Sequence, residues 1–380
     1  MGNILIVGAG RLGKGFIGEV FDKANWKISF LDKDEKVIKN LNENGCYYVT
    51  VHREDRIEER TISGYKAYTY EDIEKMKEDI ISADVIALVL YPEDFHYSID
   101  KISDFLKYRI QKEPNKNLDI LCLTNKNYLI NGFNEQFINK LNNDIYIKWY
   151  NEHVSLRDTI VRRGTDADDN ASIHVRTTAV LSLLIQEPLL VPLNDVEWLE
   201  CCDKLELLKD LKVFTVNGPH VATAFAGYLK GYKTINETLA DSDCLTLIEN
   251  VHKEIYAGIL KGYDISKEEL DKLSVFPKAK GEMEDYIYRV AYDPIRKLSR
   301  NDRLTGIAMI CIENGIEPDS ISKSIANGFA YDYEGDPNAM QIQKTINKKG
   351  IEKAIVEYCG IESSSILHDK IKFYYNKITK

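Results

Sequence analysis

The spacing of apolar residues changes along the chain. In the first half, short continuous apolar runs alternate with stretches in which apolar residues recur every three or four positions. This pattern predicts strands alternating with helices, and hence a parallel sheet. Strands are expected at 3–8, 27–32, 84–91 and 118–123, helices at 13–24, 34–43 and 92–108, and a hairpin from 47–52 and 60–68. A β-branched and leucine-rich run over 175–185 predicts one further strand.

The second half has helical periodicity almost throughout. Helices are expected at 195–207, 218–230, 235–262, 267–273, 302–314, 318–328, 337–346, 350–358 and 361–377. The change follows Pro188, so we place a domain boundary near residue 190. A chain of 380 residues is also long for a single core. We therefore predict an α/β domain over 1–190 and an all-α domain over 191–380.

A glycine-rich turn joins the first predicted strand to the first predicted helix. In the order strand, turn and helix, its Gly-x-Gly-x-x-Gly spacing is typical of a dinucleotide site. Gly8 permits a tight turn, Gly10 lets a pyrophosphate approach the backbone, and Gly13 allows helix and strand to pack closely. The next strand ends in Asp32, where a carboxylate binds a ribose 2′-hydroxyl, so NAD is favoured, although the neighbouring Lys33 leaves NADP open. The predicted cofactor-binding residues are Gly8, Ala9, Gly10, Arg11, Leu12, Gly13 and Asp32. The first domain is thus expected to be a Rossmann-type doubly wound sheet.

The composition limits which kinds of partner and which cellular compartment are expected for the protein. The net charge is −10 and charges of both signs are interspersed, which argues against nucleic acid and for a small molecule. The seven cysteines are scattered, without Cys-x-x-Cys spacing, which favours reduced thiols in the cytoplasm. We find no signal peptide or long apolar run, so no membrane association is expected. The seven histidines are dispersed without metal-ligand spacing, so no metal is expected.

A second polar motif lies in the helical half, where Lys212, Asn217 and His220 precede an apolar run. Asn217 suits a helix N-cap and Pro219 the first turn, so Asn217 and His220 would share one side, with Lys212 approaching from an extended segment. Oxidation of a secondary alcohol needs a base for the hydroxyl proton and donors that hold the oxygen. Lysine can be that base where its surroundings lower its pKa. Spacing alone also fits a capped helix with a surface lysine and a structural histidine.

With this motif the chain resembles the polyol-specific long-chain dehydrogenase family, whose members carry Lys-x4-Asn-x2-His at the start of a helix in the C-terminal domain. The runs Gly8–Gly18 and Arg289–Leu298, with Asp302-Arg303, are similar to the same family. The resemblance spans nearly the whole chain. It implies a metal-independent enzyme that uses NAD.

The resemblance also implies roles for individual residues. Lys212 would be the general acid/base, Asn217 and His220 would orient and polarise the reacting oxygen, and Asn125 would complete its binding site. Asn125 follows the predicted strand 118–123, at the edge where open parallel sheets bind ligands.

The substrate implied by the resemblance is a polyol phosphate, with mannitol 1-phosphate and fructose 6-phosphate as the expected pair. A phosphate requires cationic side chains, and guanidinium groups suit its geometry. The candidates are Arg296, Lys297 and Arg163. A solvated or salt-bridged face is the alternative for these basic clusters, because the chain has 60 acidic residues.

The chain departs from the family pattern in the stretch that leads toward the substrate. It has Leu123-Thr124-Asn125 where the family has Cys-Glu-Asn, and Val161–Asp166 replaces Val-Asp-Arg-Ile-Val-Pro. A family glutamate is replaced near Thr177-Thr178, and a Ser-Glu-Trp sequence is missing around Leu181–Leu183. These departures leave open an unphosphorylated polyol or a hexuronate as substrate.

A non-catalytic NAD(H)-binding sensor is the alternative from another class. Such a protein needs the glycine turn and Asp32, but it does not need the residues of the acid/base set. The presence of Lys212, Asn125, Asn217 and His220 together therefore argues against a sensor. The expected assembly is a monomer or a weak dimer that binds a small polyol or sugar phosphate.

Overall fold

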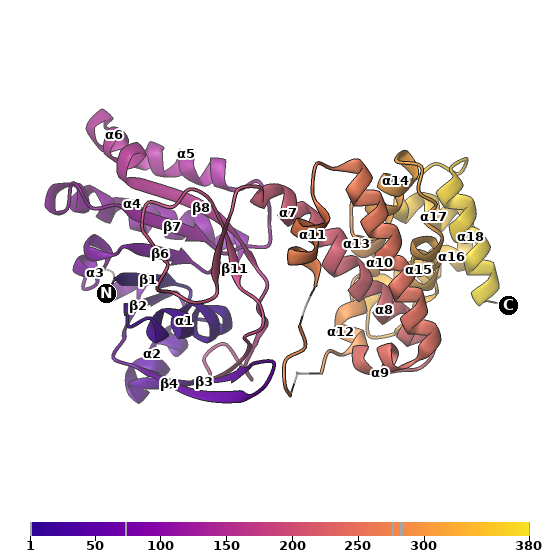
Figure 1. The fold of residues 1–380 in the computed structure, drawn as a ribbon, viewed down its shortest axis with the longest axis horizontal. Coiled ribbons are helices and arrows are strands. Elements are labelled where there is room, and N and C mark those ends of the chain that lie inside the picture. The colour runs from indigo at the N-terminus through magenta and orange to yellow at the C-terminus, as the bar shows by residue number, and fades with distance from the viewer. Residues whose placement is uncertain (1, 73, 276, 282–283, 380) are drawn as a thin grey trace. The chain divides into compact units, whose positions relative to one another are not determined.

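The computed structural model describes residues 2–72, 74–275, 277–281 and 284–379. It divides into two compact units, Met1–Lys209 with Phe276–Glu282, and Asp210–Val275 with Met283–Lys380 (Figure 1). The division therefore lies beyond the expected boundary near residue 190. The reason is that Lys209 on α7 (Leu205–Lys212) forms a buried 2.6 Å ion pair with Asp158 of the first unit. Later in the chain, Lys280 N donates to Arg53 O at 2.7 Å, which returns residues 277–281 to that unit.

The first unit is built on an eight-stranded sheet with the order β12-β11-β8-β7-β6-β1-β2-β5. The six strands from β8 to β5 pair in parallel, as expected for a doubly wound sheet, while β11 runs antiparallel to β8. The strands are β1 (Asn3–Val7), β2 (Lys27–Asp32), β5 (Lys66–Thr69), β6 (Val85–Leu88), β7 (Leu118–Cys122), β8 (Val154–Val161), β11 (Leu183–Gln186) and β12 (Leu199–Cys202). The doubly wound α/β prediction is confirmed.

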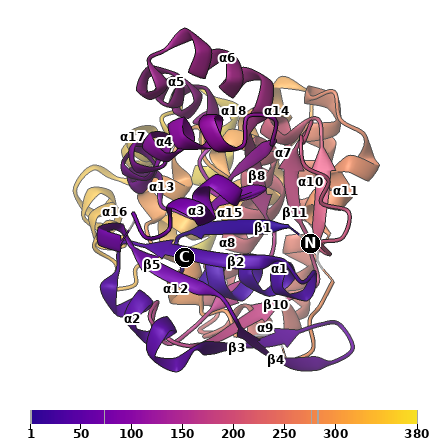
Figure 2. The same ribbon diagram turned by 90° about the vertical axis from the view of Figure 1, so that its left-hand side faces the viewer.

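Helices cover both faces of this sheet. They are a π-helical turn (Gly13–Gly18), α1 (Glu19–Lys23), α2 (Glu35–Asn44), α3 (Lys77–Ser82), α4 (Phe95–Lys112), α5 (Ile130–Leu141) and α6 (Asp144–His153), with short 3-10 turns at Tyr70–Asp72 and Pro92–Asp94. Figure 2 shows α4, α5 and α6 on one side of β1 and β2, and α1 on the other.

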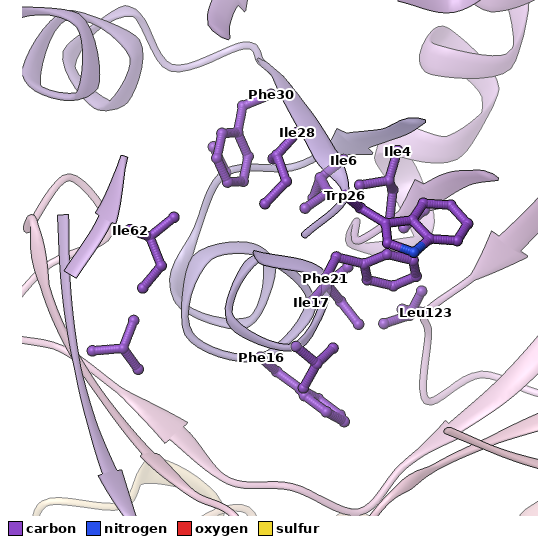
Figure 3. Close-up of a cluster of buried hydrophobic side chains, with 14 of the residues drawn as sticks. Ile4, Ile6, Phe16, Ile17, Phe21, Trp26, Ile28, Phe30, Ile62 and Leu123 are labelled. Carbon is purple, nitrogen blue, oxygen red and sulfur yellow. The ribbon is translucent and has the colours of Figure 1, made fainter. Parts of the chain in front are cut away.

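The two faces form separate cores because side chains alternate along a strand. From β1, Ile4 and Ile6 belong to the same core as Ile17 and Phe21 of the first helical segment, and Figure 3 shows these side chains grouped together. The intervening residues of β1 pack with α4, α5 and α6 instead. All of β1 after its first residue is buried, which explains its continuous apolar sequence.

A second sheet with the order β4-β3-β10-β9 adjoins the first helical segment in the same unit. Its strands are β3 (Cys46–His52), β4 (Ile57–Ser63), β9 (Thr165–Asp166) and β10 (His174–Thr178). The expected hairpin is confirmed in part: β3 and β4 pair antiparallel, but residues 66–68 of the expected second arm belong to β5 of the larger sheet. The expected strand 175–185 is wrong as one element, because β10 lies in this sheet and β11 in the larger one.

The second unit is helical. Its elements are a π-helical turn (Val213–Asn217), α8 (Gly218–Leu229), α9 (Ile235–Ala240), α10 (Ser242–Gly262), α11 (Lys267–Ser274), α12 (Ile287–Ala291), α13 (Pro294–Leu298), α14 (Thr305–Glu313), α15 (Asp319–Ala330), α16 (Pro337–Lys349), α17 (Ile351–Cys359) and α18 (Ile366–Ile378). The all-α prediction is confirmed for the second unit. The expected helix 195–207 is wrong, because Leu199–Cys202 form β12 in the sheet of the first unit, and the expected helix 235–262 is two helices. The Asp241 side chain accepts from the N–H groups of Asp243 and Cys244, so a new helix begins there.

Helix α8 is central to the second unit. It packs against α9, α10, α12 and α15, and nine of its residues are buried, which matches its apolar sequence. His220, the last residue of the Lys-x4-Asn-x2-His motif, lies in the first turn of this buried helix. Its position is therefore set by the core of the unit.

Among the described residues, no helix is long and apolar enough to cross a membrane.

Candidate active site

The glycine turn after β1 has the geometry that its sequence predicts. Gly8 has φ +104°, and a Cβ there would lie 2.2 Å from Val89 O, so only glycine fits. A Cβ on Gly13 would lie 2.0 Å from Gly8 O, which is the close helix–strand approach. Gly10 differs from both because a Cβ there would meet nothing within 4 Å. The open side of Gly10 leaves room for a ligand against the backbone.

Asp32 ties the end of β2 to this turn. Its Oδ2 accepts from Ala9 N at 2.6 Å and its Oδ1 accepts from Asp34 N at 2.9 Å. Burial raises the pKa of Asp32, and the two backbone N–H donors oppose that rise. A carboxylate has about four lone-pair sites, so Asp32 can still accept from a ligand hydroxyl. The residue therefore both shapes the turn and offers an acceptor beside it.

A cavity of about 730 Å³ brings most of the predicted first-unit residues together. Gly8, Gly10, Arg11, Leu12, Gly13, Asp32 and Asn125 all line it. Ala9 is buried in the turn and contributes its N–H to Asp32. The cavity lies at the carboxyl ends of β1, β2, β6 and β7, where parallel sheets bind ligands.

Sequence reasoning missed the aromatic wall of this cavity. Tyr70, Tyr91 and Tyr97 line it, and the rings of Tyr70 and Tyr97 meet edge to face with centroids 5.0 Å apart. The Tyr70 hydroxyl lies 2.6 Å from Ser98 Oγ. Tyr91 could have been predicted, because it comes shortly after the carboxyl end of β6, the strand next to β1, where parallel sheets bind ligands.

Lys14 is a second residue that the sequence did not single out. Its side chain is buried, and Nζ donates to Asn170 O at 2.9 Å and to Ser172 O at 2.6 Å. Burial lowers the pKa of Lys14 to about 8. Because Asn170 lines the cavity, Lys14 fastens the first helical turn to a segment of the cavity wall.

Asn125 lies on the loop that follows β7, as expected, and it is exposed. The loop is held at both sides of Asn125. Thr124 Oγ1 accepts from Lys126 N at 3.2 Å, and Asn127 Nδ2 donates to Glu206 O, at the start of α7, at 2.9 Å. Asn125 is thus a cavity-lining amide on a fastened loop.

The motif of the second unit lies on one continuous helix. Residues Leu205–Leu229 are helical without interruption, because the π-helical turn Val213–Asn217, hereafter the π turn, joins α7 to α8. The expectation of an extended segment at Lys212 and an N-cap at Asn217 is therefore wrong. Asn217 has helical φ and ψ of −77° and −26°, and its side chain makes no capping hydrogen bond.

The π turn aligns the three side chains. On a regular α-helix, at about 100° per residue, Asn217 would point about 140° away from Lys212 and His220 about 80° away. A π turn accommodates one extra residue, which reduces these separations to about 40° and 20° on either side of Lys212. All three residues are half-buried. Lys212, Asn217 and His220 therefore form one stripe, which a regular helix with this spacing would not give.

Arg163 does not have the exposure that its expected phosphate role requires. Its side chain is 0% exposed, and its Nη2 lies 2.9 Å from Oε2 of Glu19, which is 1% exposed. The guanidinium also lies over the Phe16 ring, 4.6 Å from its centroid, and Nε donates to Thr177 Oγ1 at 3.0 Å. This corrects the expectation, because the group is enclosed in the core of the first unit.

Glu19→Gln is expected to destabilise the protein by about 3–5 kcal/mol, because it leaves the buried Arg163 without its counter-charge. Urea unfolding measures the loss. Glu197→Gln is the control, since Glu197 forms an exposed pair with Lys23 and its loss is expected to cost less than about 1 kcal/mol. Equal costs for the two variants would contradict the structural role of Glu19.

Arg296 and Lys297 lie on α13 and differ in exposure. The Arg296 side chain is 54% exposed and faces Asp293 at 3.2 Å and Asp302 at 3.7 Å. Lys297 is buried, and its Nζ donates to the carbonyl oxygens of Val290 and Tyr292. Burial, with the charges of Arg303 and Arg296, lowers the pKa of Lys297 to about 8. Of the two side chains, only that of Arg296 is exposed enough for a ligand to reach it.

The described part of the chain contains no group of three His, Cys, Asp or Glu side chains that could hold a metal ion. All seven cysteines are free thiols.

Both halves of the chain match known protein families. Residues 2–180 match the mannitol dehydrogenase Rossmann domain, and residues 204–379 match the mannitol dehydrogenase C-terminal domain. The mannitol-1-phosphate 5-dehydrogenase of Thermoanaerobacter pseudethanolicus is 31% identical over 374 residues, which cover 97% of this chain and 96% of that protein.

Two solved structures share the fold over the whole chain. A D-sorbitol dehydrogenase in substrate-free form has a TM-score of 0.78 at 14% identity and is covered over 93% of its length. The Pseudomonas fluorescens mannitol 2-dehydrogenase, in a ternary complex with NAD and D-mannitol, has a TM-score of 0.67 at 15% identity and is covered over 92%. With both of its halves matched, the chain belongs to the mannitol dehydrogenase family.

Proposed function

We propose that this protein is a cytoplasmic, NAD-dependent dehydrogenase that interconverts mannitol 1-phosphate and fructose 6-phosphate, with Lys212 as general acid/base. The observation that carries the proposal is the π turn, because it places Lys212, Asn217 and His220 in one stripe. A structural helix has no need of that alignment. The 31% identical relative named mannitol-1-phosphate 5-dehydrogenase supports the substrate, and the seven free thiols favour a reducing compartment.

The first-unit cavity fits NAD. The open side of Gly10 can admit a pyrophosphate, the helix start offers N–H groups, and Asp32 can accept from a ribose hydroxyl. Asp32 would repel a 2′-phosphate. Lys33, the residue that left NADP open, is engaged with Asp94 at 2.6 Å. When bound, the nicotinamide ring supplies the hydride acceptor for the carbinol carbon, and the donor in the reverse reaction.

Lys212 takes the hydroxyl proton when the polyol is oxidised and returns it when the keto-sugar is reduced. Asn217 and His220 hold the same oxygen as its bond order to carbon changes. Positioned donors stabilise the charge that develops on oxygen in the transition state, and this stabilisation often contributes more to the rate than any other effect. No metal is required for these roles.

Arg296 is proposed to bind the substrate phosphate, with the buried charge of Lys297 beside it. Arg163 is left out of this site because it is enclosed with Glu19. A neutral polyol is the second candidate substrate. It is favoured by Asp293 and Asp302, which already face the Arg296 guanidinium and reduce its attraction for an anion.

A substrate panel tests the proposal. Purified protein is mixed with NADH and, in turn, fructose 6-phosphate, fructose and a hexuronate, and NADH absorbance is followed. We expect the highest kcat/KM with fructose 6-phosphate. A higher value with fructose would favour the unphosphorylated polyol, whereas NADH binding without turnover on the panel would indicate the sensor.

Arg296→Met is expected to raise the KM for fructose 6-phosphate about tenfold or more, since a charge-assisted contact contributes about 1.5–3 kcal/mol. The KM for fructose should change little, because fructose has no phosphate. Arg56→Met is a control for loss of a surface guanidinium with the same 54% exposure as Arg296. An equal rise in KM for both sugars would contradict a phosphate contact.

A further inference from the structure

His220 faces a carboxylate within its own unit. Its Nε2 lies 2.9 Å from Oδ2 of Asp285, and the His220 and Asp285 side chains are 40% and 25% exposed. The contact joins α8 to the segment that precedes α12, more than sixty positions later in the sequence. Sequence spacing gave no indication of it.

The backbone around Asp285 is fixed by pairing with the start of α9. Asp285 O accepts from Ile235 N at 2.9 Å, and Thr234 and Tyr286 form an isolated antiparallel bridge. Thr234 is in turn held by a capping box with Glu237. The carboxylate is therefore presented to His220 from a rigid support.

The Asp285 carboxylate is held in its ionised form. Burial alone would raise the pKa of Asp285, but hydrogen bonds and charges from His220 and Arg289 outweigh it and lower the pKa. The other oxygen, Oδ1, accepts from Arg289 Nε at 3.1 Å. An ionised carboxylate can only accept hydrogen bonds, so the nitrogen of His220 that faces it must carry a hydrogen.

We propose that Asp285 is a positioning residue that holds His220 with Nε2 protonated, so that Nδ1 is the nitrogen presented to the reacting oxygen of the substrate. The partner of one ring nitrogen sets the protonation of the other. With Nε2–H donating to Asp285, Nδ1 of a neutral His220 carries no hydrogen, and it is the doubly protonated ring that donates Nδ1–H to the reacting oxygen, whose own hydroxyl proton goes to Lys212. This inference rests on the proposed function for the identity of the oxygen.

Protonation of the ring is measured first, without substrate or cofactor. In protein labelled with ¹⁵N-histidine, the His220 shifts of the neutral ring are expected to show the Nε2–H tautomer. Asp285→Asn should shift the population toward Nδ1–H, while Glu284→Gln, which removes the charge of a neighbouring exposed carboxylate, should not. A tautomer unchanged by Asp285→Asn would overturn the proposal.

Kinetics then separate positioning from stability. Asp285→Asn is expected to lower kcat for fructose 6-phosphate reduction about 10- to 100-fold, with little change in KM and a changed pH profile. In a His220→Ala background the same substitution should cost less than about twofold, because its effect passes through His220. An equal cost in both backgrounds would overturn the proposal. If the unmodified protein turns over no keto-sugar, the proposed function fails, and the ¹⁵N measurement still decides whether Asp285 sets the tautomer.

Discussion

Lys212→Met is expected to lower kcat for fructose 6-phosphate reduction by about 10²–10⁴-fold, the contribution typical of a positioned general acid/base. The methionine preserves the length and most of the apolar stem of lysine, so the helix and its packing should persist. NADH binding should be unchanged, because the glycine turn and Asp32 lie in the other unit. Stopped-flow absorbance gives the rate, and quenching of protein fluorescence gives the NADH affinity.

Lys261→Met is the matched control for this variant. Lys261 is an exposed lysine in the last turn of α10, and its loss should leave kcat within about twofold. Addition of a small primary amine should restore part of the activity of Lys212→Met and none to the control. Near-normal turnover by Lys212→Met would exclude Lys212 as the acid/base.

Exchange of two adjacent residues tests the π turn itself. The double variant Lys212→Val/Val213→Lys keeps the composition and moves the ammonium group by one position. On a regular α-helix it would stand four residues before Asn217 and seven before His220, within about 40° of both. On the π turn, the same exchange moves the ammonium group out of the stripe shared with His220. We therefore expect a loss of kcat as large as that of Lys212→Met.

Val213→Ala is the control for the exchanged position, and it should retain most of the activity because Val213 is only half-buried. Circular dichroism and thermal unfolding should show that the exchanged protein remains folded. High activity in the exchanged protein would mean that Val213–Asn217 is a regular α-helix in solution.

The first unit shows what local pattern can predict. The glycine turn, Asp32 and the strands around them were expected from apolar runs, turn residues and one acidic position, because each depends on interactions within a few residues. Strand β8 was missed because Ser155, Arg157, Asp158 and Thr159 interrupt its apolar run. Its buried Asp158 is compensated by Lys209, from a helix about fifty residues later.

The candidate phosphate residues show where local pattern fails. Arg163 and Arg296 are equally basic in sequence, yet one is enclosed with Glu19 and the other is half-exposed. The difference depends on a partner 144 positions away, which no window of sequence contains. Charge alone therefore could not separate a core ion pair from a ligand contact.

Local sequence pattern was enough to predict a dinucleotide-type α/β half, a helical half and the candidate site residues. The alignment of Lys212, Asn217 and His220, the contact of Asp285 with His220 and the burial of Arg163 are visible only in the folded chain. The physical reason is the distance along the chain over which each interaction acts. Periodicity and turn chemistry arise between near neighbours, whereas burial, ion pairing and the extra residue of a π turn depend on which distant segments pack against them.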